Sequence, residues 1–502
     1  MPALRRLFSA LLACGICVHA SLAASGGSAA ADLPDIGTPA DSTLTRTDEL
    51  QLGRMVVRGL RDQNEVLDDP EVTEYIQSLG QRLAAQTGDD NQQFQYFVVK
   101  DRAVNAFALP GGFVGVNAGL ILLTNSESEL ASVLGHETAH VKQRHIARAI
   151  QAQGRSAMTS TAALLAALLI GAATGAGGDA MMGAVAMSQG MAMQQSINFT
   201  RSEEAEADRV GITLLAGAGF DTTAMANFFE TMGRSEGVSD AGPLDLLRSH
   251  PVTRERIAEA RARAAQYPRV QPADSPSYEL MRERVRVLSA TASSPATRYY
   301  AALQKQRKLS TAERYGQALA ELQENHDTTG LATLRALRDA NPQITPLYGA
   351  LGQALLTSGD VPGSLQVYEQ ASKLFPRNVP LTVRYSEALM QAGQAQRAHE
   401  LLLDLFNNVE PTPDQIRLTA LAASAAGDPG DAYYYMGEYH ISGGDLQLAM
   451  QQLELALAAP NLTDVQRQRF RARLDDVRGW VREQRQSQRG GDQGDRGGSG
   501  RG

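Results

Sequence analysis

Apolar positions recur with a helical period over residues 46–85, and Asp69-Pro70 interrupts this pattern where a second helix can begin. A long helix is predicted to begin near Ser126, because Leu130, Val133, Leu134 and Val141 form an apolar stripe that buries one face. Ser126 with Glu129 is a candidate capping box for its first turn, and Thr124 with Glu127 would serve as well.

Two segments between these helices have the pattern of short strands. Residues 94–99 are strand-like, and residues 105–123 predict short strands around two turns, Pro110-Gly111-Gly112 and Asn117-Ala118-Gly119. The long helix is therefore expected to follow a small sheet directly.

The long helix carries His136, Glu137 and His140 in the pentapeptide His-Glu-Thr-Ala-His. Two histidines at i and i+4 share one helix face, so both imidazoles can reach a single tetrahedral Zn²⁺. Glu137 is placed to act as general base on the water that the metal activates. A solvated helix face is the plainer alternative, but the apolar stripe buries this helix, and buried histidines and carboxylates need a partner such as a metal.

A second helix, rich in Glu and Ala, is predicted over residues 199–209 and is the source of a third ligand. Glu204 and Asp208 share one of its faces. One of them can ligate the metal while the other accepts a hydrogen bond from the far nitrogen of a ligating imidazole. Glu203 and Glu206 are interpreted as ordinary charged positions. His145, about 140° round the helix from His140, is interpreted as structural.

The His-Glu-x-x-His pentapeptide and the Glu-x-x-x-Asp of Glu204 and Asp208 resemble the gluzincin metallopeptidases of the CAAX prenyl protease, HtpX and BepA type. The resemblance covers about residues 46–265, and includes residues 105–112 and 250–257. It implies that Glu204 is the third metal ligand, with Asp208 as its supporting carboxylate.

The same resemblance gives two further residues a role. It implies that His250, which would otherwise be interpreted as structural, can approach the zinc as a fourth, regulatory ligand and close the water position. It also implies that Arg256 stabilises the oxyanion of the tetrahedral intermediate.

The first residues predict secretion. Arg5 and Arg6 precede an apolar run too short to span a membrane, so residues 1–23 are expected to be a signal peptide and residues 24–45 a flexible leader. Cys14 and Cys17 are the only cysteines, so the mature chain would carry no thiol, which is compatible with the periplasm. Lipidation at Cys14 is the less favoured alternative, because the residues before it form a poor lipobox.

Charge and hydropathy limit the partners. A net charge of −8 offers no electrostatic reason to bind nucleic acid. The apolar part of residues 157–193 is too short for a membrane span, and the segment is expected to form a buried helix followed by a flexible, Met-rich flap near the cleft. Peripheral membrane contact is the alternative for this segment.

The second half of the chain is repetitive. Gly359, Gly393 and Gly427 lie 34 residues apart, and so do Pro342 and Pro376. This period in an Ala- and Leu-rich background is typical of tetratricopeptide repeats, which are expected over residues 301–484 after a connecting segment at 271–300. Such a solenoid binds proteins on its concave face, although a structural buttress is the alternative. Residues 485–502 are expected to be disordered.

The predicted fold is an α+β zincin-like metalloprotease domain over residues 46–270, mostly helical with a small sheet, followed by an all-α tetratricopeptide solenoid. The resemblance implies a periplasmic endopeptidase with one Zn²⁺ per chain, and with chaperone activity, in the assembly and quality control of outer-membrane β-barrel proteins. Its expected partners are unfolded or misassembled outer-membrane proteins, and the barrel assembly machinery through the repeats. A latched chaperone or adaptor with little proteolysis at rest is the alternative.

Overall fold

The computed structural model describes residues 45–89, 92–152, 199–235, 245–270, 272, 274–325 and 329–496. The expected signal peptide, almost all of the leader and the Met-rich segment at 157–193 lie outside these residues. All of the described residues belong to one compact unit. Within the described ranges, no helix combines the length and hydropathy that a membrane span requires.

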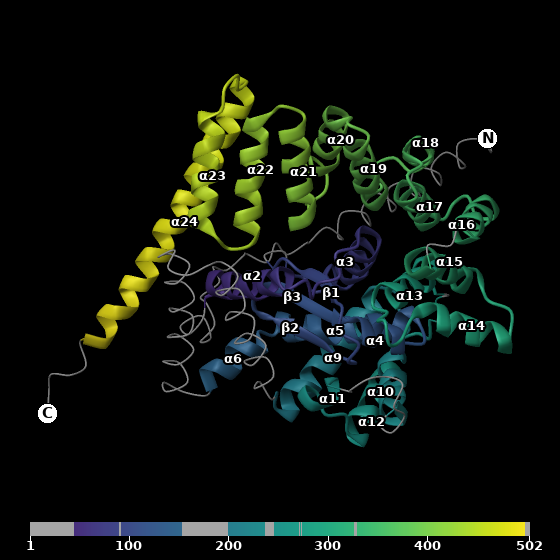
Figure 1. The fold of residues 1–502 in the computed structure, drawn as a ribbon. Helices are drawn as coiled ribbons and strands as arrows, with labels where there is room; N and C mark the ends of the chain where they lie inside the picture. Colours follow the sequence, from purple (N-terminus) through teal and green to yellow (C-terminus); the bar gives the residue numbers. More distant parts are fainter. Residues whose placement is uncertain are drawn as a thin grey trace, which may run out of the picture. The chain divides into compact units, whose positions relative to one another are not determined.

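The first part of the described chain is a small sheet with helices packed against it (Figure 1). Its elements are α2 (Arg46–Asp62), α3 (Pro70–Ala84), β1 (Gln95–Val99), β2 (Ala106–Leu109), the 3-10 turn η2 (Pro110–Gly112), β3 (Phe113–Asn117), α4 (Ala118–Leu123), α5 (Glu127–Lys142), α6 (His145–Ala152), α9 (Arg201–Gly217), α10 (Ala224–Ser235), α11 (Leu246–Ser249) and α12 (Arg254–Ala264). The strand order is β1-β3-β2, with β1 parallel and β2 antiparallel to β3. Helix α5 packs against β2 and β3, and α3 packs against β1.

One predicted element is wrong. Residues 118–123 form helix α4, where a further short strand was expected. Gly119 lies so close to the backbone of Arg102 that a Cβ would be 2.0 Å from that carbonyl oxygen, so the chain turns tightly into the helix directly after β3. The apolar run at 120–123 is too short for its period to distinguish a helix from a strand.

Helix α5 begins at the predicted cap and is buried over nearly its whole length. The Ser126 side chain accepts a hydrogen bond from the Glu129 N–H at 3.2 Å, whereas the Glu129 carboxylate accepts from Asn125 N–H rather than closing the box on Ser126. Helices α5 and α9 cross at Gly135 and Gly211, where a Cβ on Gly211 would lie 3.1 Å from the backbone nitrogen of His136. The two helices are therefore in direct backbone contact beside the metal motif.

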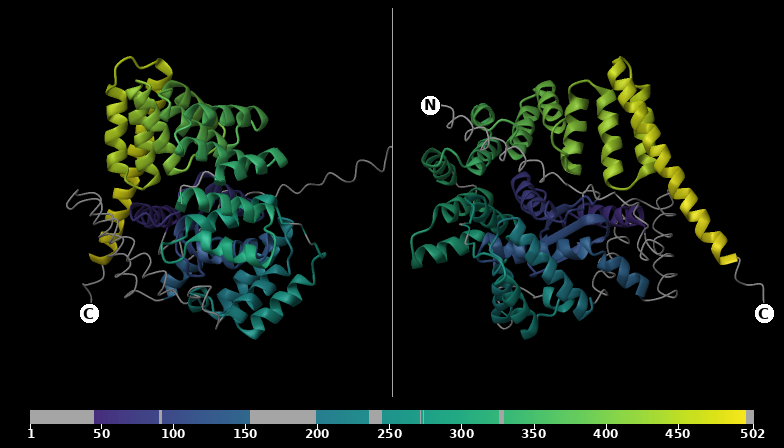
Figure 2. Two further views of the ribbon diagram at one scale, coloured as in Figure 1. Left: turned by 45° about the vertical axis from the view of Figure 1, so that its right-hand side comes forward. Right: turned by 180° about the vertical axis from the view of Figure 1, so that it is seen from behind.

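The second part of the described chain is all helical and confirms the predicted solenoid (Figure 2). Its elements are α13 (Pro276–Leu288), α14 (Ala296–Gln306), α15 (Thr311–Asn325), α16 (Thr329–Ala340), α17 (Thr345–Thr357), α18 (Val361–Leu374), α19 (Val379–Gln391), α20 (Ala395–Phe406), α21 (Pro413–Ala425), α22 (Pro429–Ser442), α23 (Leu446–Ala458) and α24 (Asp464–Arg496). Gly359, Gly393 and Gly427 have φ of 88°, 73° and 81° directly after α17, α19 and α21. This left-handed conformation ends a helix and favours glycine, which explains the 34-residue spacing.

The last helix extends further than expected. Leu474, Val477 and Val481 of α24 are buried together with residues of α23, and the helix continues to Arg496, although disorder was expected from residue 485. Gln and Arg, which dominate residues 485–489, have high helix propensity and continue the helix that this packing begins.

A buried ionic cluster joins α3 to two later helices. Asp69, which caps α3, accepts hydrogen bonds from Arg284 of α13 at 2.7 and 2.6 Å and from Arg384 of α19 at 2.8 Å. Glu71 lies 3.2 Å from Arg284 and 3.1 Å from Arg384. The expected boundary at 271–300 therefore falls within one compact unit that ion pairs hold together.

Candidate active site

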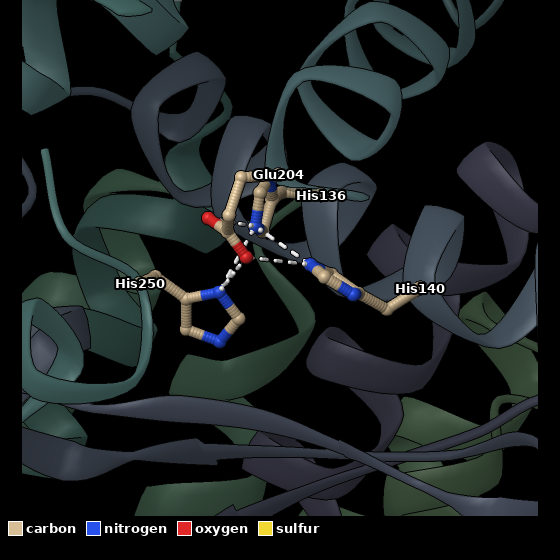
Figure 3. A group of neighbouring side chains, drawn as sticks. All are labelled: His136, His140, Glu204 and His250. Atoms are coloured by element: carbon tan, nitrogen blue, oxygen red, sulfur yellow. Dashed lines mark hydrogen bonds and ion pairs between the residues drawn. The ribbon is translucent and has the colours of Figure 1, made fainter. Parts of the chain in front are cut away.

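Four buried side chains from three places in the chain converge on one point (Figure 3). His136 and His140 come from α5, Glu204 comes from the first turn of α9, and His250 follows α11. Nε2 of His136 lies 3.1 Å from Nε2 of His140 and 3.3 Å from Nδ1 of His250. Oε1 of Glu204 lies 3.3 Å from Nε2 of His140 and 2.8 Å from Nδ1 of His250.

These donor atoms fit a tetrahedral zinc ion. A centre with zinc–nitrogen bonds of about 2.0–2.1 Å has ligand atoms about 3.3–3.4 Å apart. Three of the four separations above are close to this value, and the Glu204–His250 pair is shorter, at 2.8 Å. The donor set of three imidazoles and one carboxylate is also one that zinc prefers. Glu137 is fully buried beside this group, and neither of its carboxylate oxygens has a hydrogen-bond partner among the described residues. A carboxyl group buried in this way requires a polar partner in the site.

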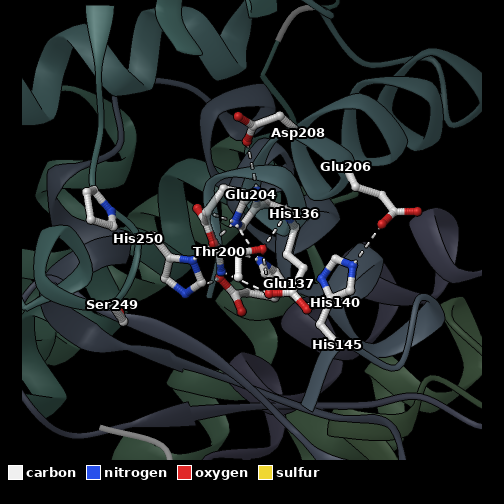
Figure 4. Close-up of polar contacts among 12 residues, drawn as sticks. His136, Glu137, His140, His145, Thr200, Glu204, Glu206, Asp208, Ser249 and His250 are labelled. Atoms are coloured by element: carbon white, nitrogen blue, oxygen red, sulfur yellow. Dashed lines mark hydrogen bonds and ion pairs between the residues drawn. The ribbon is translucent and has the colours of Figure 1, made fainter. Parts of the chain in front are cut away.

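The outward nitrogen of His136 is supported by a carboxylate. Its Nδ1 lies 2.9 Å from Oδ1 of Asp208, one turn along α9 from Glu204 (Figure 4). Arg256 of α12 donates to both oxygens of Asp208 at 2.8 Å, and its Nη1 lies 2.7 Å from Oε2 of Glu204. The guanidinium thus braces two carboxylates of the site, and its predicted contact with an oxyanion stays a prediction.

The charges of the site hold both α9 carboxylates ionised. Burial alone would raise the pKa of Glu204, but His250, His140 and His136 outweigh it and hold that pKa far below its usual range. Burial also opposes ionisation of Asp208, whose pKa is nevertheless lowered by hydrogen bonds from Arg256 and His136. Both carboxylates are therefore negatively charged, as the binding of a cation requires.

The buried imidazoles differ from each other. Burial lowers the pKa of His140 well below its usual value, so this side chain is neutral, as a metal ligand must be. Burial would likewise lower the pKa of His250, but the carboxylates of Glu137 and Glu204 raise it above the usual value. Without a metal, His250 thus tends to hold a proton.

The structure adds three residues that sequence analysis did not assign to the site. Nδ1 of His145 lies 2.9 Å from Nδ1 of His140, and Nε2 of His145 lies 3.3 Å from Oε2 of Glu206 (Figure 4). The ring of Phe199 lies 4.1 Å from that of His140 and 5.5 Å from that of His250. Helical spacing did not predict that His145 contacts His140, because α5 ends at Lys142 and His145 belongs to the next helix, α6. No local sequence signal marks Phe199.

Comparison with known proteins supports a peptidase and a repeat domain. The model of peptidase family M48 matches residues 70–264, and a tetratricopeptide repeat model matches residues 355–422. A mitochondrial metalloendopeptidase of Schizosaccharomyces pombe is 31% identical over 185 residues, which are 37% of this chain and 51% of that protein.

Two relatives described as beta-barrel assembly-enhancing proteases are more similar. That of Vibrio cholerae is 44% identical over 254 residues, which are 51% of this chain and 52% of that protein, so the match spans about half of the relative. That of Escherichia coli K12 is 32% identical over 457 residues, which are 89% of this chain and 91% of that protein. The chain therefore belongs to the M48 family of metallopeptidases, in the branch of the beta-barrel assembly-enhancing proteases.

Proposed function

We propose that this metallopeptidase is a zinc endopeptidase with one Zn²⁺ per chain, held by His136, His140 and Glu204. The convergence of these three donor atoms beside Glu137, whose carboxylate oxygens have no hydrogen-bond partner among the described residues, carries the proposal. A bound zinc ion would supply Lewis-acid chemistry, polarising the scissile carbonyl and making a water molecule more acidic. Asp208 fixes the imidazole of His136 so that Nε2 faces the metal, as supporting carboxylates do.

Glu137 is the proposed general base. Its carboxylate is buried on α5 next to the first histidine, and neither oxygen forms a hydrogen bond to the described residues. It can therefore take the proton of the attacking water and deliver it to the leaving amine. Nε2 of His250 lies 3.7 Å from Oε1 of this carboxylate.

His250 is the proposed regulatory ligand. Its Nδ1 already lies among the donor atoms of the other three ligands, where it would occupy the position that a catalytic zinc site keeps open. His250 is the C-cap of α11, with φ of −129° and ψ of 75°, and so lies outside the regular part of α11 and α12. This placement favours the second candidate function, a latched chaperone or adaptor whose proteolysis is low at rest.

Strand β2 is the proposed docking edge for an extended client. It lies at the edge of the sheet and packs on α5. The Asn105–Asn117 hydrogen bond and the register with β3 turn the backbone groups of Ala106 and Ala108 away from β3, although the residues of this strand are buried. The opposite edge is covered, because Gln77 accepts from Tyr96 N–H at 2.8 Å. A client could therefore add to the sheet only beside the catalytic helix.

The cellular role rests on the relatives. The curated names of two relatives describe proteases that enhance β-barrel assembly. By analogy, this chain would work in the periplasm on unfolded or misassembled outer-membrane proteins, both assisting their assembly and degrading them. The repeats would bind components of the barrel assembly machinery, because tetratricopeptide solenoids recognise proteins on their concave faces.

Casein turnover by the purified full-length protein tests the endopeptidase. Turnover should vanish with a zinc chelator, return with Zn²⁺, and be absent in Glu137→Gln despite unchanged zinc content. Glu255→Gln, an exposed carboxylate on α12, is the matched control and should behave as wild type. Full turnover in Glu137→Gln would refute the mechanism. Client refolding without cleavage in wild type would favour the latched chaperone.

A further inference from the structure

The chain makes an unusual turn to bring His145 to the metal site. Helix α5 ends at Lys142, and Arg144 has a left-handed φ of 51°, which is uncommon for a residue other than glycine. Its side chain is held by an ion pair with Glu49 at 3.4 Å. Helix α6 then begins at His145, which is completely buried. Such strain persists only where surrounding contacts hold it, and it is common at functional sites.

The ligand geometry determines the direction of the hydrogen bonds. Nε2 of His140 faces the other donor atoms, so a metal there leaves the ring proton of His140 on Nδ1. His140 then donates through Nδ1, and Nδ1 of His145 accepts at 2.9 Å. The remaining proton of His145 is on Nε2, which faces Oε2 of Glu206 at 3.3 Å. Arg148 also donates to this oxygen at 3.3 Å.

We propose that His145 and Glu206 are positioning residues that orient the metal ligand His140, an inference that rests on the zinc site proposed above. His136 reaches its carboxylate, Asp208, directly, whereas His140 reaches Glu206 through the imidazole of His145. Glu206 polarises His145, so that His145 accepts more strongly and makes His140 a better donor to the metal.

The partial exposure of Glu206 limits how strongly it can polarise His145. Its side chain is 25% exposed, compared with 9% for Asp208, and water weakens its field. His145 itself has no solvent access, so its contact with His140 is the stronger link. The removal of His145 should therefore cost more metal affinity than neutralisation of Glu206.

The affinity of the full-length, metal-free protein for Zn²⁺, measured by competition with a chromophoric chelator, tests the assignment. In asparagine the side-chain amide places an acceptor oxygen at the position of Nδ1, whereas in glutamine this position is a carbon. His145→Gln should weaken binding by about 10- to 100-fold, the usual effect of an outer-sphere partner, and His145→Asn should restore most of this loss. Glu206→Gln should weaken binding less, and the exposed control Glu259→Gln should leave it unchanged.

The outcomes of these affinity measurements separate a positioning role for His145 from a role in packing alone. Packing alone would favour glutamine, which is closer to histidine in volume, so affinity retained in His145→Gln and lost in His145→Asn overturns the proposal. Equal affinity in wild type and all His145 and Glu206 variants also overturns it while leaving the zinc site intact. Failure of wild type to bind Zn²⁺ refutes the zinc site and the inference with it. Thermal melting of the metal-free variants shows whether any loss of affinity arises from unfolding, which would likewise contradict a positioning role.

Discussion

Asp69→Asn should destabilise the protein strongly although it changes only one charge. Asparagine is as good a helix cap as aspartate, so the hydrogen bond from Val72 N–H to the side chain can remain. What disappears is the charge that faces two buried guanidiniums, leaving Arg284 with Glu71, and Arg384 with Glu71 and the partly exposed Glu387. Breaking a buried ion pair by removing one partner costs about 3–5 kcal/mol, and we expect a loss in this range.

The effect should depend on pH in a defined direction. Burial alone would raise the pKa of Asp69, but Arg284 and Arg384 outweigh it and hold this pKa well below its usual range. A depressed pKa gives stability that is present above the unfolded value of about 3.9 and is lost as the pH falls through the folded value. The difference between wild type and Asp69→Asn should therefore be full at pH 7 and shrink below about pH 4.

Denaturant unfolding followed by circular dichroism, with a chelator present throughout, measures this difference. The control is Asp404→Ala, which removes an exposed pair with Arg377 at 3.4 Å and should cost less than about 1 kcal/mol. An Asp69→Asn protein as stable as this control at pH 7 would refute the reasoning. So would a difference that stays constant down to pH 2.

Four further variants separate the roles within the site. Glu137→Gln should keep zinc but lower the rate of casein cleavage by about 10²- to 10⁴-fold, the range for a general base, and elemental analysis with casein kinetics checks both. Glu204→Ala should lose zinc. His250→Ala should keep zinc and raise basal casein turnover. A fall in turnover at full zinc content would instead give His250 a catalytic role. Arg256→Lys cannot brace Asp208 with two parallel hydrogen bonds, so it should weaken Zn²⁺ binding in a chelator titration, and a purely kinetic defect would contradict this.

Local patterns predicted much of this molecule. The pentapeptide at His136 and the caps at Ser126 and Asp69 lie within one or two turns of the helices they define, and the structure places these helices where they were expected. The repeats were predictable for the same reason, because Gly359 and its equivalents satisfy a backbone requirement that recurs at every period.

Long-range contacts were not predictable in this way. Asp69 meets Arg284 and Arg384 across 215 and 315 residues, and no sequence period connects them. Continued helical spacing would place His145 about 140° round the helix from His140. In the structure, the left-handed conformation of Arg144 ends the helix and brings His145 next to His140. The roles of Asp208, Arg256 and His250 came from family resemblance, and their placement around the donor atoms depends on α9 and α12 packing against α5 and α10.

The glycine crossing of α5 and α9 makes the metal site a property of the backbone. A Cβ on Gly211 would lie 3.1 Å from the nitrogen of His136 and 3.2 Å from the carbonyl carbon of Gly135, so even alanine would push the two ligand-bearing helices apart by a few tenths of an ångström. Plausible metal–ligand distances fall within about 0.2 Å of their usual values. Gly211 therefore matters to the site through the backbone, because it allows α9, which carries Glu204, to approach α5, which carries His136 and His140.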